Sequence, residues 1–67
     1  MYTVDARGLS CPEPVMLMLE AIGSHKDAVE VIVDNATARG NVAHMAEERG
    51  RKVTITEKNG DYHLVLK

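Results

Sequence analysis

The stretch VTITEKNGDYHLVL at residues 53–66 decides the fold of this chain. Asn59-Gly60 is the preferred pair for a two-residue type I′ turn between antiparallel strands. Counting back from this turn pairs Glu57 with Tyr62, Ile55 with Leu64 and Val53 with Leu66. The last two pairs place four aliphatic side chains on one face, and the other face carries Thr54, Thr56, His63 and Val65. Such a division predicts a sheet that is covered on one side only.

Four further elements are expected before this hairpin. They are a strand at Tyr2–Asp5, a helix from Pro12 to about Ile22 ended by Gly23 and Ser24, a strand at Val29–Val33, and a helix from Ala36 to Arg49, capped by Asp34 or Asn35 and closed by Gly50. The order β-α-β-α-β-β predicts an α+β fold, a two-layer α/β sandwich with two helices on one face of a mixed four-stranded sheet. The first crossover should be right-handed.

Composition narrows the functional classes. The chain has 67 residues, 45% of them hydrophobic and 27% charged, and a net charge of −2, which indicates a single globular domain over residues 1–67. That domain is either a small complete protein or the N-terminal domain of a longer one. Without a basic surface or aromatic stacking groups, direct nucleic-acid binding is not expected. No apolar run has the length of a signal peptide or membrane span, and the single cysteine suits the cytoplasm.

The run Gly8-Leu9-Ser10-Cys11-Pro12-Glu13-Pro14 places that cysteine at the predicted start of the first helix. If Ser10 is the N-cap, Glu13 completes a capping box; if Cys11 is the N-cap, Pro12 occupies the first helical position. Either arrangement puts the sulfur at the positive end of the helix, which favours an anion. A cysteine held there can have its pKa lowered from about 8.5 into the range ~3.5–7.5, and its thiolate is then a nucleophile.

The rest of the sequence excludes several uses of such a thiolate. A thioredoxin-type oxidoreductase needs a second, resolving cysteine, and none is present. A cysteine hydrolase needs a nearby base, but the three histidines at 25, 44 and 63 are not expected beside the helix start. One cysteine and scattered histidines also make no metal site, and no cofactor is expected. What remains is a lone, exposed, activated sulfur that carries something. A single thiol can accept a sulfane sulfur, hold it as a persulfide and hand it on to another protein's thiol or to a substrate.

Neighbouring residues have expected supporting roles. Pro12 and Pro14 start the helix and position the sulfur, and the Gly8 turn leaves it accessible. Asp5 is expected to fix the loop by accepting hydrogen bonds from backbone N–H groups. Arg7 either offsets the charge of the sulfur or is solvated. Glu13 is a capping residue or a partner contact. Four basic residues are expected in solvent, with the alternative that they cluster to receive an acidic partner or a tRNA-bound complex: Arg39, Arg49, Arg51 and Lys52.

The chain resembles the TusA/SirA-like family of small sulfur-carrier proteins through the motif Asp5-x-x-Gly8-Leu9-x-Cys11-Pro12-x-Pro14, which contains the CPxP signature. The resemblance covers essentially the whole chain. It implies strand order 1-2-4-3, like that of the C-terminal domain of translation initiation factor three, and a persulfide on Cys11. The stretch Asp34–Ala38 with Asn41-Val42 is more similar to the YedF-like branch, which includes N-terminal domains of proteins linked to selenium metabolism.

The sequence therefore predicts a sulfur carrier, or persulfide sulfurtransferase if it is an enzyme, with Cys11 as its catalytic residue. Its expected partners are a sulfur donor resembling a cysteine desulfurase and a sulfur-acceptor protein. The alternatives are a regulatory or protein-binding module in which Cys11 senses redox state, and a selenium-handling variant of the carrier. The reactivity of Cys11 separates the carrier from the module.

Overall fold

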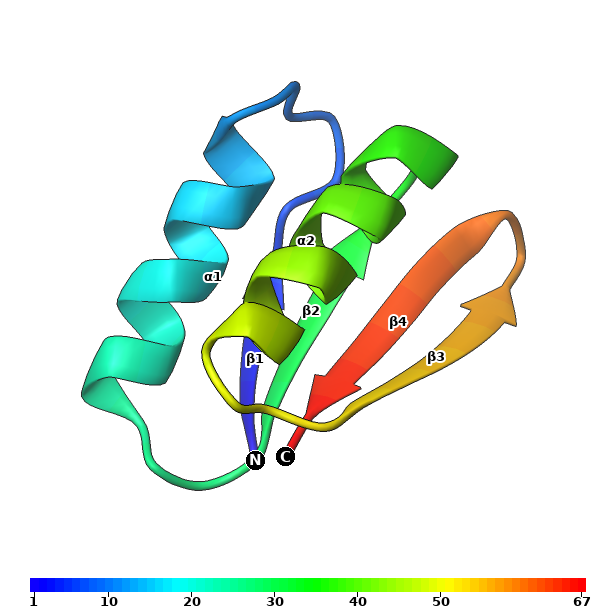
Figure 1. Cartoon of the computed structure of the whole chain (residues 1–67). Helices are drawn as coiled ribbons and strands as arrows, with labels where there is room; N and C mark the ends of the chain where they lie inside the picture. Colours follow the sequence, from blue (N-terminus) through cyan, green and yellow to red (C-terminus); the bar gives the residue numbers. More distant parts are fainter.

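The computed structural model describes all residues from 1 to 67. Its elements are β1 (Tyr2–Asp5), α1 (Glu13–Ser24), β2 (Val29–Val33), α2 (Ala36–Glu48), β3 (Val53–Lys58) and β4 (Asp61–Leu66). The sheet has the order β1-β2-β4-β3, in which only β1 and β2 are parallel. Both helices lie on the same face of this sheet (Figure 1). The predicted α+β sandwich and the strand order 1-2-4-3 are confirmed.

The β3–β4 hairpin has the predicted register. Val53 lies opposite Leu66 and Ile55 opposite Leu64, and the turn residues Asn59 and Gly60 both have positive φ, as a type I′ turn requires. The burial of this hairpin is uneven, however. Both leucines of β4 are buried, whereas Ile55 is 44% exposed. The reason is that β3 is an edge strand: Val53 still packs against the core, whereas Ile55 lies beyond it.

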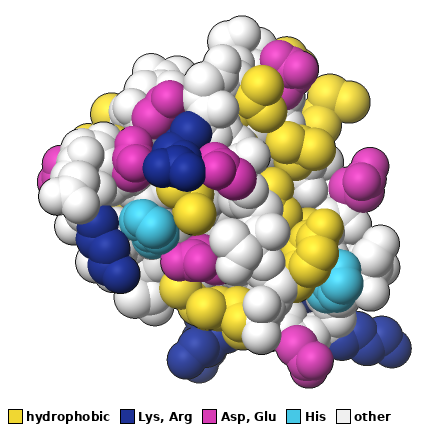
Figure 2. Space-filling model, turned by 180° about the vertical axis from the view of Figure 1, so that it is seen from behind, with side chains coloured by type: hydrophobic (Ala, Val, Ile, Leu, Met, Phe, Trp, Pro, Cys, Tyr) yellow, Lys and Arg dark blue, Asp and Glu magenta, His cyan; other side chains and the backbone are white.

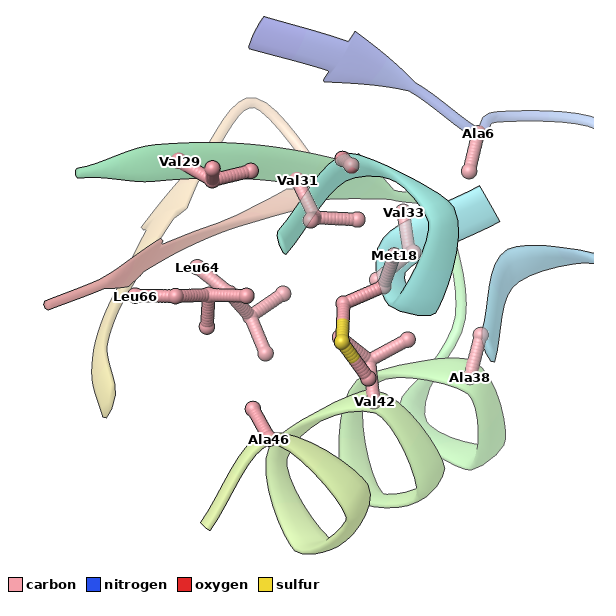
Figure 3. Close-up of a cluster of buried hydrophobic side chains, with 11 residues drawn as sticks. Ala6, Met18, Val29, Val31, Val33, Ala38, Val42, Ala46, Leu64 and Leu66 are labelled. Carbon is pink, nitrogen blue, oxygen red and sulfur yellow. The ribbon is translucent and has the colours of Figure 1, made fainter. Parts of the chain in front are cut away.

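The core lies between the helices and β2 with β4 (Figure 3). Met18 of α1 lies against Val42 of α2, and both side chains are fully buried over the valines of β2. The three valines of β2 alternate with less buried residues, because successive side chains of a strand point to opposite faces. Burial of these apolar side chains is the main stabilising contribution. Neither helix is long and apolar enough to cross a membrane.

The helix boundaries differ in part from the prediction. The first helix begins at Glu13 with Pro12 as its N-cap, and no side chain caps it, so both capping alternatives for α1 were wrong. It continues through Gly23 and Ser24, the two residues that were expected to end it, and its C-cap is His25. In α2 the side chain of Asn35 accepts a hydrogen bond from the N–H of Ala38 at 2.8 Å, which is an N-cap interaction.

Arg51 is not the solvated side chain that the sequence suggested. Its guanidinium donates to three backbone carbonyl oxygens, at 2.8, 3.3 and 3.2 Å, which belong to His25, Asp27 and Leu66. Arg51 therefore connects the α1–β2 loop to the end of β4. Arg39 is also engaged, because its guanidinium lies over the ring of Tyr62, 4.8 Å from the centroid.

Candidate functional site

Cys11 is a free, exposed thiol in the loop that joins β1 to α1. The loop leaves the sheet in a defined way, because the N–H of Ala6 donates to the carbonyl of Ile32 at 2.8 Å and extends the pairing of β1 with β2. Gly8 has a φ of +78°. Residues other than glycine adopt this backbone conformation only with strain. The turn predicted at Gly8 is present, and it leads the chain across the end of the sheet toward Cys11.

Asp34, the residue that follows β2, holds this turn. Its Oδ2 atom accepts a hydrogen bond from the N–H of Gly8 at 2.7 Å. The second carboxylate oxygen accepts one from the side chain of Asn35 at 3.1 Å. Asp34 was one of two candidates for the N-cap of α2. Since Asn35 takes that position, the carboxylate of Asp34 is directed to the cysteine loop instead.

Asn41 of α2 is the side chain in hydrogen-bonding contact with the cysteine. Its Nδ2 atom lies 3.6 Å from Sγ of Cys11 and donates to it. Asn41 was not among the site residues predicted from the sequence. The available signal was its position, because asparagine is a poor helix former and here occupies the interior of α2.

The first turn of α1 lies farther from Sγ of Cys11, and supplies fewer hydrogen-bond donors to it, than the sequence predicted. Cys11 lies one residue before the N-cap, outside the first turn. The N–H of Glu13 already donates to the carbonyl of Ser10 at 3.0 Å, and Pro14 has no N–H. The donor to the sulfur therefore comes from α2, through Asn41.

Asp5 and Arg7 brace the other side of the loop. Asp5 accepts from the backbone N–H of Arg7 at 3.1 Å and from its guanidinium at 2.8 and 2.9 Å. Arg7 also donates to Asp61 of β4 at 3.1 Å. These bonds with Arg7 lower the pKa of Asp5 to about 2, while the two carboxylates raise the pKa of Arg7. The guanidinium is directed to carboxylates and makes no hydrogen bond with Cys11.

The two prolines and Glu13 have different environments. Pro14 is buried in the first turn of α1, Pro12 is exposed beside the sulfur, and the Cys11–Pro12 peptide bond is cis. Glu13 is exposed and lines a surface groove of about 390 Å³ next to the cysteine loop. The remaining lining residues are Leu9, Met16, Leu17 and Glu20. The groove thus combines an apolar floor with two carboxylates.

The histidines do not converge on the sulfur. His63 lies on the uncovered face of the sheet, where its Nδ1 atom is 3.0 Å from Glu30. This contact, assisted by Thr3, lowers the pKa of Glu30. Acidic and basic side chains lie next to one another on this face (Figure 2). His25 stacks on Tyr2, and no group of three or more potential ligands is placed to hold a metal ion.

Comparisons with known proteins agree on one family. The family model "Sulfurtransferase TusA" matches residues 2–67. A candidate sulfur carrier protein of Archaeoglobus fulgidus is 26% identical over 68 residues, which span 98% of this chain and 93% of that protein. The crystal structure of a SirA-like protein from Desulfitobacterium hafniense superposes with a TM-score of 0.93 at 36% identity, covering 98% of this chain and 95% of the other. The chain therefore belongs to the TusA/SirA-like family of sulfur-carrier proteins.

Proposed function

We propose that this protein carries sulfane sulfur as a persulfide on Cys11 and delivers it to an acceptor protein. The observation that carries the proposal is the state of this thiol. It is free and exposed, lies in a loop anchored by Asp34 and by the Asp5–Arg7 pair, and receives a hydrogen bond from Asn41. The setting of the proposed reaction is the cytoplasm, where thiols stay reduced.

The loading step needs no oxidant. The thiolate of Cys11 attacks the terminal sulfur of a persulfide on the donor. The S–S bond of the donor breaks, its cysteine leaves as a thiolate, and a new S–S bond forms on Cys11. Delivery repeats this exchange, with an acceptor nucleophile attacking the terminal sulfur and Cys11 leaving as the thiolate. Proximity of a second thiol would discharge the persulfide, and the chain has no other cysteine.

The surroundings of the sulfur suit such an exchange. The amide of Asn41 is a neutral donor, so it can hydrogen-bond to a thiolate without supplying a titratable proton. The exposed position of Cys11 lets the sulfur of another protein approach within bonding distance. We place Pro12 and Pro14, with Gly8, in the role of orienting the loop. The groove lined by Glu13 supports docking of a donor that resembles a cysteine desulfurase, or of the acceptor.

The direct test is intact-mass spectrometry after incubation with a cysteine desulfurase and free cysteine. The expected result is a gain of one sulfur atom, reversed by a reductant and absent in Cys11→Ser. A matched control, the double variant Ser10→Cys with Cys11→Ser, keeps one thiol in the same loop but moves it away from Asn41. We expect this variant to load poorly.

Two results would contradict the proposal. One is the absence of loading in the wild type under conditions that load an established carrier. The other is equal loading of Cys11→Ser. The first result would favour the redox-sensing or protein-binding module, in which Cys11 is not a carrier.

A further inference from the structure

The β3 strand lies at an open edge of the sheet. It pairs with β4 on one side and has no neighbour on the other. In Figure 1 it lies at the margin of the sheet, on the side of α2 and away from α1. Its six residues pair with β4 in a continuous register without a bulge, and the strand contains no proline. A bulge and a proline are two features by which proteins prevent edge-to-edge pairing, and β3 has neither; its charged residues, Glu57 and Lys58, lie at its C-terminal end.

The hydrogen bonds of the hairpin determine which backbone groups of β3 are free. The N–H of Lys67 donates to the carbonyl of Lys52 at 2.8 Å, so residue 52 faces β4. Because backbone direction alternates along an antiparallel strand, residues 54, 56 and 58 also face β4. The N–H and C=O groups of Val53, Ile55 and Glu57 consequently point outward. None of them has a partner elsewhere in the chain.

We propose that this edge pairs with the same edge of a second copy of the chain. An antiparallel arrangement with its two-fold axis at Ile55 brings Ile55 opposite its equivalent, and Val53 opposite Glu57 of the second copy. Every outward N–H and C=O of the three residues then meets a complementary group. The result is a continuous eight-stranded sheet with all four helices on one face. This proposal is independent of the sulfur chemistry.

The central side chains of β3, Thr54, Ile55 and Thr56, are compatible with this register. On the helix-covered face, the two Ile55 side chains meet beside Val53 of each copy, which buries the most exposed aliphatic side chain of the sheet. On the other face, Thr54 lies opposite Thr56 of the second copy, and threonine pairs are favourable across strands. At each end Lys52 lies opposite Lys58. This repulsion is screened by salt, so we expect the dimer to strengthen as ionic strength rises.

The other edge of the sheet is less suited to pairing. Strand β1 has four residues, and a charged pair of Asp5 and Arg7 closes its end. The cysteine loop follows β1, at the opposite side of the sheet from β3. Pairing through β3 therefore leaves both copies of Cys11 exposed. Since two short strands make a small interface, the dimer should be weak and depend on protein concentration.

Sedimentation velocity over micromolar to millimolar concentrations tests the proposal. The wild type should shift from monomer to dimer, and Ile55→Lys should remain a monomer. A matched control is Met16→Lys, which makes the same change at an exposed apolar residue of α1 and should still dimerise. A wild type that stays monomeric at millimolar concentration, or a dimer that survives Ile55→Lys, overturns the proposal.

Amide hydrogen exchange tests the register in which β3 pairs with β3 of the second copy. It uses the wild type, so the result does not depend on the folding of a variant. The N–H groups of Val53, Ile55 and Glu57 should exchange more slowly at high than at low protein concentration. Those of Thr54 and Thr56 are already bonded to β4, so their exchange should change less. Concentration-dependent protection confined to another surface would place the interface elsewhere and refute pairing through β3.

Discussion

The hydrogen bond from the N–H of Gly8 to Asp34 is the contact that we expect to hold the cysteine loop. It is 2.7 Å long and joins residues 26 positions apart in the chain. Hydrogen bonds to charged groups contribute about 1.5–3 kcal/mol. Both partners are exposed here, so we expect Asp34→Ala to lower the free energy of unfolding by about 1 kcal/mol. For a domain of this size that corresponds to a fall in Tm of about 4–8 °C.

Two measurements test this expectation together. Thermal unfolding followed by circular dichroism gives the change in Tm, and amide hydrogen exchange reports on Gly8 itself. In Asp34→Ala the N–H of Gly8 loses its acceptor and should exchange faster, whereas core amides of β2 should change only as much as global stability does. The matched variant Asp34→Asn keeps an acceptor oxygen but loses the charge. This variant should lower Tm less, and accelerate exchange of the Gly8 amide less, than Asp34→Ala does.

If Asp34→Ala melts at the wild-type temperature and leaves exchange at Gly8 unchanged, the carboxylate does not hold the loop. If Tm falls as much in Asp34→Asn as in Asp34→Ala, the stabilisation comes from the negative charge near the start of α2 and not from the hydrogen bond with Gly8.

Three more predictions concern the remaining contacts. Arg51→Met removes three hydrogen bonds to carbonyl oxygens and should lower the free energy of unfolding by about 2 kcal/mol, measured by urea denaturation with an unchanged m-value. Asn41→Ala removes the hydrogen-bond donor to Sγ and should slow alkylation of Cys11 by iodoacetamide at neutral pH. The Tm of this variant should stay the same or rise, because alanine is the better helix former. An unchanged alkylation rate would contradict a role of Asn41 at the sulfur. Asp5 has a pKa of about 2 because of Arg7, so its stabilising contribution is full above the unfolded value of about 4 and is lost as pH falls toward 2. The variant Asp5→Asn should flatten the stability profile in that acid range, and an equal slope in both proteins would refute this.

Local sequence patterns explain why so much of the fold was predictable. Asn59-Gly60 sets the hairpin register through turn chemistry, and the β-branched run at Val29–Val33 marks the central strand. The exposed cysteine in the β1–α1 loop also follows from neighbouring residues, because Gly8 makes the turn and the prolines start the helix. Errors arose where several caps were locally possible, as at the beginning of α1.

The sequence by itself determined the order of elements, the pairing within the hairpin and the place of the thiol in the chain, because each depends on residues a few positions apart. Only the tertiary structure decided what surrounds that thiol. Asn41 reaches Cys11 across 30 positions, and Asp34 reaches Gly8 across 26. Such contacts follow from how α2 and β2 pack against the loop, and no local preference of asparagine or aspartate specifies them.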